Sequence, residues 1–239
     1  MRGLKAGAAL GCAVLFSVIG AGAANAGPIQ NFDSGWYQNN GFTAGVANIN
    51  VGSSNLSGAI YNNYLAFSLA NLANQNITSA TLTFYGGNGV NTSSTSETLG
   101  LFDYKGSINA LLSDQFSTSV FTDLGNGNSY GTATVAPGAI SQFTITLSAA
   151  AIADLNIAAH SQDTRFVIGG SLQSVSGPFA NEQLFAIFGP QTALSPAAEL
   201  NLVTSPVPEP STWAMMILGF GAVGAVCRRK RTGATLRFA

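Results

Sequence analysis

The chain has 239 residues, of which 46% are hydrophobic and only 8% are charged, with nine basic residues against ten acidic ones. Seven of the basic residues lie in the first five or the last twelve positions, so segment 27–204 holds nine acidic and two basic residues and carries a net charge of about −7. This balance excludes the basic surface that nucleic-acid binding requires, and we expect no nucleic-acid partner. Both cysteines also lie outside 27–204, which excludes disulfides, cysteine nucleophiles and cysteine metal sites in that segment.

The first 26 residues have the pattern of a secretory signal peptide. A basic start with Arg2 and Lys5 precedes an apolar stretch of small residues, and an A-x-A cleavage site follows it. The residues that define this cleavage site are Ala24, Ala26 and Gly27, so we expect a mature chain that begins at Gly27 and is exported through the inner membrane. A lipobox at Cys12 is the alternative.

Segment 27–204 alternates apolar and polar residues in many short runs, which is typical of half-buried strands. Irregular structure with one or two short strands is expected from 29 to 58. The expected strands beyond it are 65–69, 77–85, 98–104, 119–122, 129–135, 142–147, 165–172, 183–188 and 199–203. One helical turn is expected at 108–112, and one convincing helix, Ala149–Ile157, follows Ser148 as its N-cap.

These elements predict an all-β domain, an antiparallel β-sandwich of jelly-roll type with one short helix, and a Greek-key sandwich is the second choice. The strands Phe67-Ser68-Leu69 and Ile77 to Leu82 are similar to a strand pair of extracellular jelly-roll modules, including modules grouped with carbohydrate-binding modules. This resemblance concerns the fold more than the function.

Carbohydrate binding in such a domain would use exposed aromatic rings that stack on sugars, with Asn and Gln as hydrogen-bonding partners. Trp36 and Tyr37 lie in an Asn-rich stretch and form the candidate glycan-binding pair, whereas the alternative, which we favour for these aromatic residues, is burial in the core. The other candidates are Tyr61, Tyr64, Tyr85 and Tyr130.

Catalytic groups are few, and we expect no enzyme. His160 is the only histidine, and with Ser161 and Asp163 beside it the residue types of a triad are present, although a histidine after a helix commonly caps the last carbonyls. A carboxylate pair for glycan hydrolysis has no motif. We expect no cofactor, with calcium near Asp123 and the turn 125–128 as the alternative, since oxygen ligands are present there.

The end of the chain has four ordered features. Pro208, Glu209 and Pro210 come first, Trp213 and Ala214 follow, a run without charge continues to Cys227, and a basic cluster closes the series. The basic residues are Arg228, Arg229, Lys230 and Arg231. Seventeen uncharged residues from Ser211 are at the lower limit for a transmembrane helix, so we expect one at 213–231, after a linker at 205–212 and before a cytoplasmic tail at 232–239.

This arrangement resembles the PEP-CTERM sorting signal of Gram-negative bacteria in its PEP-x-x-WA form. The resemblance implies recognition by an exosortase, attachment to the membrane before processing, and release or transfer of the domain 27–204. It predicts a protein of the cell envelope or extracellular matrix associated with extracellular polysaccharide. A carbohydrate-binding module in the same matrix is the alternative, followed by a secreted hydrolase.

Overall fold

The computed structural model describes residues 24–43, 48–85, 90–92, 94–136, 142–185, 198–207 and 210–231. Pro208 and Glu209, the expected tail 232–239 and the last residues of the expected strand 183–188 lie outside the described residues.

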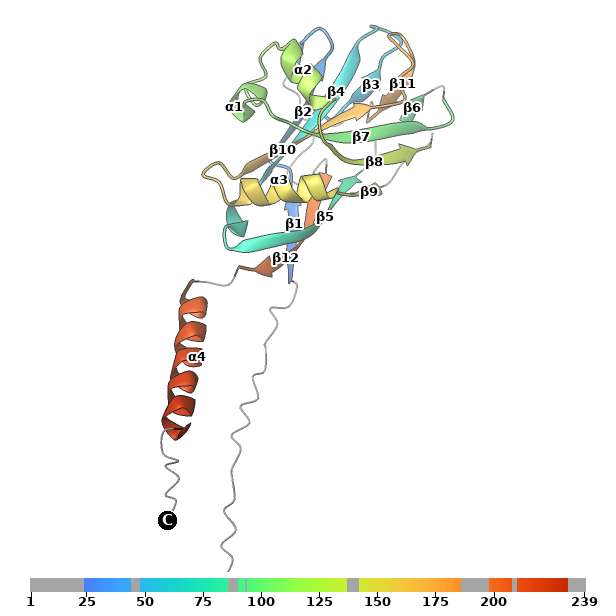
Figure 1. Cartoon of the computed structure of the whole chain (residues 1–239). Helices are drawn as coiled ribbons and strands as arrows, with labels where there is room; N and C mark the ends of the chain where they lie inside the picture. The colour runs from blue at the N-terminus through green and yellow to red at the C-terminus, as the bar shows by residue number, and fades with distance from the viewer. Residues whose placement is uncertain are drawn as a thin grey trace, which may run out of the picture.

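Two antiparallel sheets form the body of the molecule (Figure 1). The four-stranded sheet has the order β1 (Ala24–Gln30), β12 (Ala198–Pro206), β5 (Gln75–Tyr85) and β9 (Gln142–Thr146). The eight-stranded sheet has the order β6 (Val90–Thr92), β11 (Glu182–Leu184), β3 (Val51–Ser53), β4 (Ile60–Ser68), β10 (Arg165–Leu172), β7 (Glu97–Asp103) and β8 (Ser129–Val135), and β2 (Asp33–Gln38) pairs with β4. The expected all-β antiparallel architecture is confirmed, whereas a jelly-roll topology is not.

The main core lies between the sheets and follows from the alternation of the strands. On β5, Ala80, Leu82 and Phe84 are buried, while Ser79 and Thr81 point to the other face. Across from them the core takes side chains from the larger sheet, among them those of β4, β7 and β10: Leu65, Phe67, Leu99, Leu101, Phe166 and Ile168.

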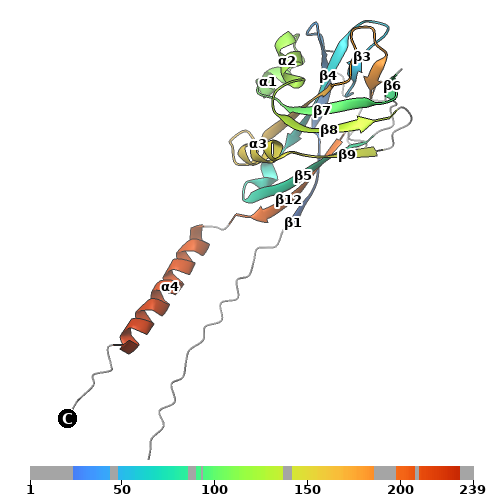
Figure 2. The same cartoon turned by 45° about the vertical axis from the view of Figure 1, so that its right-hand side comes forward.

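Helix α3 (Ala149–Ala159) runs along the opening between the two sheets (Figure 2). Ser148 caps it as expected, because its Oγ accepts a hydrogen bond from the amide of Ala151 at 3.3 Å. The Asn156 side chain then pairs with the backbone of Ile77 on β5, accepting from its amide at 2.8 Å and donating to its carbonyl at 2.9 Å. This pairing fixes the helix against the four-stranded sheet.

Two shorter helices, α1 (Ile108–Leu111) and α2 (Thr118–Leu124), cover the outer face of the larger sheet over a second core. The expected strand at 119–122 is therefore wrong, because Ser117 caps a helix through the amide of Val120 and the helical spacing buries Val120 and Leu124. A 3-10 helix, η1 (Ala70–Leu72), follows β4.

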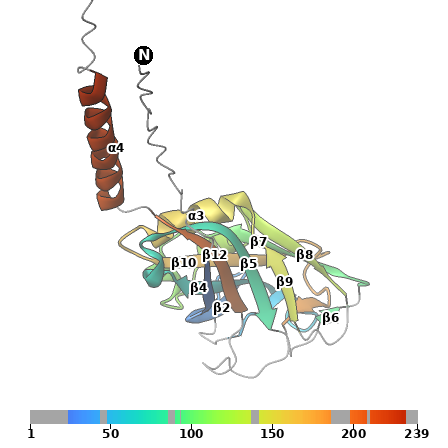
Figure 3. The ribbon, with the colours of Figure 1, turned by 90° about the horizontal axis from the view of Figure 1, so that it is seen from below.

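Helix α4 (Pro210–Arg231) lies apart from both sheets in all three views (Figures 1, 2 and 3). It follows β12 directly, and the strand extends two residues into the segment expected as a linker. The start of β1 pairs with the end of β12, with Ala24 opposite Thr204, so both ends of the sandwich domain emerge at one pole.

Candidate functional site

The outer face of the four-stranded sheet is a polar surface built by strand alternation. Thr81 and Thr83 on β5 lie opposite Asn201 and Glu199 on β12, and on the other side opposite Thr146 and Thr144 on β9. Neighbouring side chains bond to one another: Thr83 and Thr144 share a hydrogen bond of 3.0 Å, and the amide of Asn201 donates to Thr83 at 3.5 Å. The sequence predicted that these strands have a polar face, but it did not predict the groove that crosses this face.

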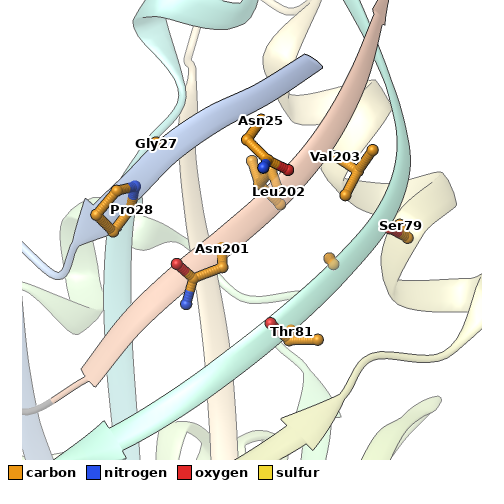
Figure 4. Close-up of a pocket in the computed structure, with 9 residues that line it drawn as sticks. Asn25, Gly27, Pro28, Ser79, Thr81, Asn201, Leu202 and Val203 are labelled. Carbon is orange, nitrogen blue, oxygen red and sulfur yellow. The ribbon is translucent and has the colours of Figure 1, made fainter. Parts of the chain in front are cut away.

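A groove of about 390 Å³ crosses this face where β1, β12 and β5 lie side by side (Figure 4). Its lining combines amide and hydroxyl groups with a larger share of apolar surface, and it contains no ionisable side chain. The lining residues are Asn25, Gly27, Pro28, Ser79, Ala80, Thr81, Asn201, Leu202 and Val203. Hydroxyls and amides along an open groove can exchange hydrogen bonds with a neutral hydroxyl-rich ligand without the cost of removing a charge from water.

Tyr85 marks the far end of β5 on the same face as Thr81 and Thr83. Its hydroxyl donates to Glu199, and this hydrogen bond raises the pKa of the tyrosine. Glu199 also accepts from the side-chain amide of Gln30 at 3.5 Å. The carboxylate is therefore held between two neutral donors at the rim of the polar face.

The candidate glycan-binding pair Trp36 and Tyr37 does not lie on an exposed surface, and this expectation is corrected. Trp36 is 8% exposed and packs edge-on against Tyr61 at 5.0 Å between ring centroids, while Tyr37 is fully buried in the second core. The Tyr37 hydroxyl donates to the Leu111 carbonyl at 2.8 Å, and burial raises its pKa to about 12. Pairing of β2 with β4 buries one ring on each face of the sheet, so neither ring is open to a sugar.

The residues of the tentative triad cap a helix and do not contact each other as a catalytic unit. His160 ends α3 and its Nδ1 lies 2.7 Å from the Asn156 carbonyl, whereas the Ser161 hydroxyl donates to the carbonyls of Ala158 and Asp163. Asp163 forms an ion pair with Arg165 at 2.6 Å, and this contact lowers the pKa of the carboxyl. The group therefore supports the end of the helix.

The candidate calcium turn is engaged in backbone contacts. Asp123 lies in α2 and accepts the amides of Lys105 and Gly106 at 2.9 and 2.8 Å, and Asn128 donates to Asp103 at 2.7 Å. Within the described ranges, no group of three or more His, Cys, Asp or Glu side chains is arranged to hold a metal ion.

The expected signal-peptide cleavage site lies on strand β1, since Ala24, Ala26 and Gly27 all belong to it. The register shifts between Asn25 and Pro28, and Gly27 takes the positive φ of 73° that this irregularity requires. Cleavage after Ala26 would remove Asn25 from the groove but leave Pro28 to Gln30 paired with β12.

The tail turns from strand to helix over a short distance. β12 remains paired through Pro206, and the amide of Val207 donates to the Asn74 carbonyl at 3.1 Å. Pro210 then begins α4, where a proline is favoured because it has no amide to leave unpaired. Trp213 and Ala214 follow within the first turns with exposed side chains, and the helix ends in the basic cluster at Arg231.

A family model described as PEP-CTERM protein-sorting motif matches residues 206–231. The chain carries a PEP-CTERM sorting motif. This confirms the prediction made from the Pro-Glu-Pro segment, the Trp-Ala pair and the basic cluster. No curated protein matches the chain.

The sorting motif indicates that the protein is exported and is processed by an exosortase, and it implies a location at the cell envelope or surface. In the structure the motif comprises the end of β12 and the whole of α4. The match ends before the expected tail 232–239.

Among the residues that the structure describes, no helix combines the length and the apolar character needed to cross a membrane. The expected transmembrane helix at 213–231 is therefore not confirmed. The expected segment is helical, but Gly219, Gly221 and Gly224 dilute the apolar run and charged residues follow Cys227.

Proposed function

We propose that this exported, exosortase-processed protein acts without catalysing a reaction, as a surface or matrix component associated with extracellular polysaccharide. The sorting motif at 206–231 carries this proposal, because it assigns the protein to the compartment in which such polymers accumulate. Segment 27–204 is then the part that works outside the cell.

The groove on the four-stranded sheet supports a second candidate function, that of a carbohydrate-binding module in the same matrix. A neutral polysaccharide presents hydroxyls and ether oxygens, and the groove offers the Asn201 amide and the Thr81 and Ser79 hydroxyls in return. The net charge of about −7 for 27–204 favours a neutral polymer over an acidic one, because like charges would repel.

A binding experiment separates the two candidates. The full chain is incubated with exopolysaccharide purified from the native host, and with cellulose as a comparison, and the bound fraction is measured after sedimentation. Direct binding supports the carbohydrate-binding module, and we expect the double variant Thr81→Ala with Asn201→Ala to bind at least about tenfold more weakly, since each lost hydrogen bond contributes about 1 kcal/mol.

The matched control is Thr134→Ala with Asn126→Ala, which removes the same side-chain types from exposed positions in β8 and in the turn before it. Equal binding by wild type and both double variants would contradict the groove as the contact surface. If no variant binds polysaccharide while the protein still fractionates with the matrix of the host, the role is structural. Matrix fractions that lack the protein would contradict the association itself.

A further inference from the structure

Two carboxylates of the larger sheet, those of Glu97 and Glu182, are both buried. Glu97 is fully buried and Glu182 is 4% exposed. They begin β7 and β11, strands that are not neighbours in the sheet. They lie near each other, because Thr92 donates to Glu97, Ser94 donates to Glu182, and the Ser94 amide donates to the Thr92 hydroxyl at 2.9 Å.

Hydroxyl groups from two short turns surround both carboxylates. Thr92 and Ser174 donate to Glu97, whereas Ser94 and Ser176 donate to Glu182 at 3.2 and 2.9 Å. The backbone amide of Ser176 adds a further bond of 2.7 Å to Glu182. Each turn thus contributes one hydroxyl to each carboxylate.

Among the residues that the structure describes, no lysine or arginine forms an ion pair with these two carboxylates. Segment 27–204 contains only Lys105 and Arg165, and they pair with Asp103 at 3.0 Å and Asp163 at 2.6 Å. Asp103 lies at the other end of β7 and is buried like Glu97. Of these two buried carboxylates, Asp103 has a basic partner in Lys105, whereas Glu97 has none among the described residues. Burial of carboxylates without an opposite charge is costly.

Ser53 supplies an independent sign that a ligand belongs at this place. It is fully buried, and its hydroxyl has no hydrogen-bond partner within the described part of the chain. Ser53 lies directly opposite Glu182 across β3 and β11, and Glu182 lies opposite Thr92 across β11 and β6. Residues opposite one another on antiparallel strands share a face of the sheet, so the Ser53 side chain lies on the same face as the Glu182 side chain. A buried hydroxyl without a partner is destabilising and points to a missing neighbour.

We propose that Glu97 and Glu182 bind a calcium ion, with hydroxyl oxygens of the surrounding Ser and Thr residues as further ligands. The donor set contains only oxygen, its charge of −2 matches that of the ion, and Ca²⁺ accepts about six to eight oxygen ligands in flexible geometry. Zinc prefers nitrogen and sulfur, and Mg²⁺ retains its waters in such sites. The ion ties β7 to β11.

Calorimetry and thermal unfolding of the chelator-treated full chain test this proposal. Added Ca²⁺ is expected to bind with a Kd on the order of 10⁻⁴ M, as in extracellular modules, and to raise the unfolding midpoint, with a smaller effect from Mg²⁺. The variants Glu97→Gln and Glu182→Gln are expected to weaken calcium binding at least tenfold. Asp163→Asn, which removes an exposed carboxylate elsewhere, is expected to bind calcium like the wild type.

Ser53→Ala gives a second test that does not depend on loss of the carboxylates. Without calcium this variant is expected to be at least as stable as the wild type, because an unpartnered buried hydroxyl is removed. With calcium it is expected to gain less stability than the wild type. The proposal is overturned if the wild type binds no calcium by calorimetry, or if Glu182→Gln and Ser53→Ala respond to calcium as the wild type does.

Discussion

At the scale of single residues, Asp33 and Asp163 make opposite contributions to stability as the pH changes. Burial raises the pKa of Asp33 above its usual value of 3.8, beside Tyr64, while the contact with Arg165 lowers the pKa of Asp163. A raised pKa means that the folded protein holds its proton more tightly than the unfolded chain does. The contribution of Asp33 is therefore complete below pH 3.8 and is lost as the pH rises through its folded pKa.

We predict that Asp33→Asn abolishes the loss of stability that ionisation of Asp33 causes as the pH rises. The unfolding midpoint of the variant, relative to wild type, should rise as the pH increases from about 3.8 through the weakly acidic range, because the neutral amide never acquires the buried charge. Thermal unfolding at a series of pH values measures the effect. Asp163→Asn should show the opposite sign, since its stabilising contact is present above the unfolded pKa and is lost as the pH falls. A difference for Asp33→Asn that does not vary with pH would contradict the argument.

At the scale of elements, α2 depends on close contact with the backbone of β10 at Gly169. A Cβ placed on Gly169 would lie 2.4 Å from the Leu124 carbonyl oxygen at the end of α2. The existing contact is backbone against backbone, so an added Cβ would meet no flexible side chain that could move away. This close approach of two backbones explains why a glycine stands inside strand β10.

We predict that Gly169→Ala lowers the free energy of unfolding by about 1 to 3 kcal/mol, the range typical of overpacking, because α2 must move away from the sheet. Chemical denaturation monitored by tryptophan fluorescence is a suitable measurement. Gly219→Ala is the matched control, since a Cβ there meets nothing within 4 Å. An unchanged midpoint for Gly169→Ala, equal to that of the control, would show that the helix adjusts without cost.

Elements with a strong local pattern were predictable, and arrangements that depend on distant pairing were not. The alternation of Ile77 to Tyr85 and the cap at Ser148 are local, and both are confirmed. The run around Val120 has the composition of a strand, but packing on β4 and β10 makes it a helix. The burial of Trp36 depends on pairing with Asn63, and Glu97 and Glu182 are linked only through the hydroxyls of Thr92 and Ser94. No sequence pattern links such residues.

At the scale of the whole molecule, the sandwich and the sorting motif are separate parts of one chain. We predict that replacing Pro208-Glu209-Pro210 with three alanines abolishes exosortase processing in the native host while the sandwich still folds. Intact-mass analysis of cell fractions measures the processed form. Thr235→Ala with Leu236→Ala, outside the matched residues 206–231, is the control and should be processed normally. Normal processing of the triple-alanine variant would mean that the segment is not recognised.

Strand β12 is paired up to Pro206, so only a short length of unpaired chain separates the folded domain from Pro208. The last described backbone hydrogen bond of this segment runs from the amide of Val207, immediately before Pro208, to the carbonyl of Asn74. Each further residue in extended conformation lengthens the chain by at most about 3.5 Å. If the processing enzyme binds the motif in an extended conformation, we expect its rate to depend on fraying of the last paired residues of β12. Insertion of a Gly-Ser segment between Val207 and Pro208 should then accelerate processing, whereas an unchanged rate would show that the enzyme needs no additional length of chain. An accelerated rate would mean that the folded end of β12 limits how fast the motif is processed.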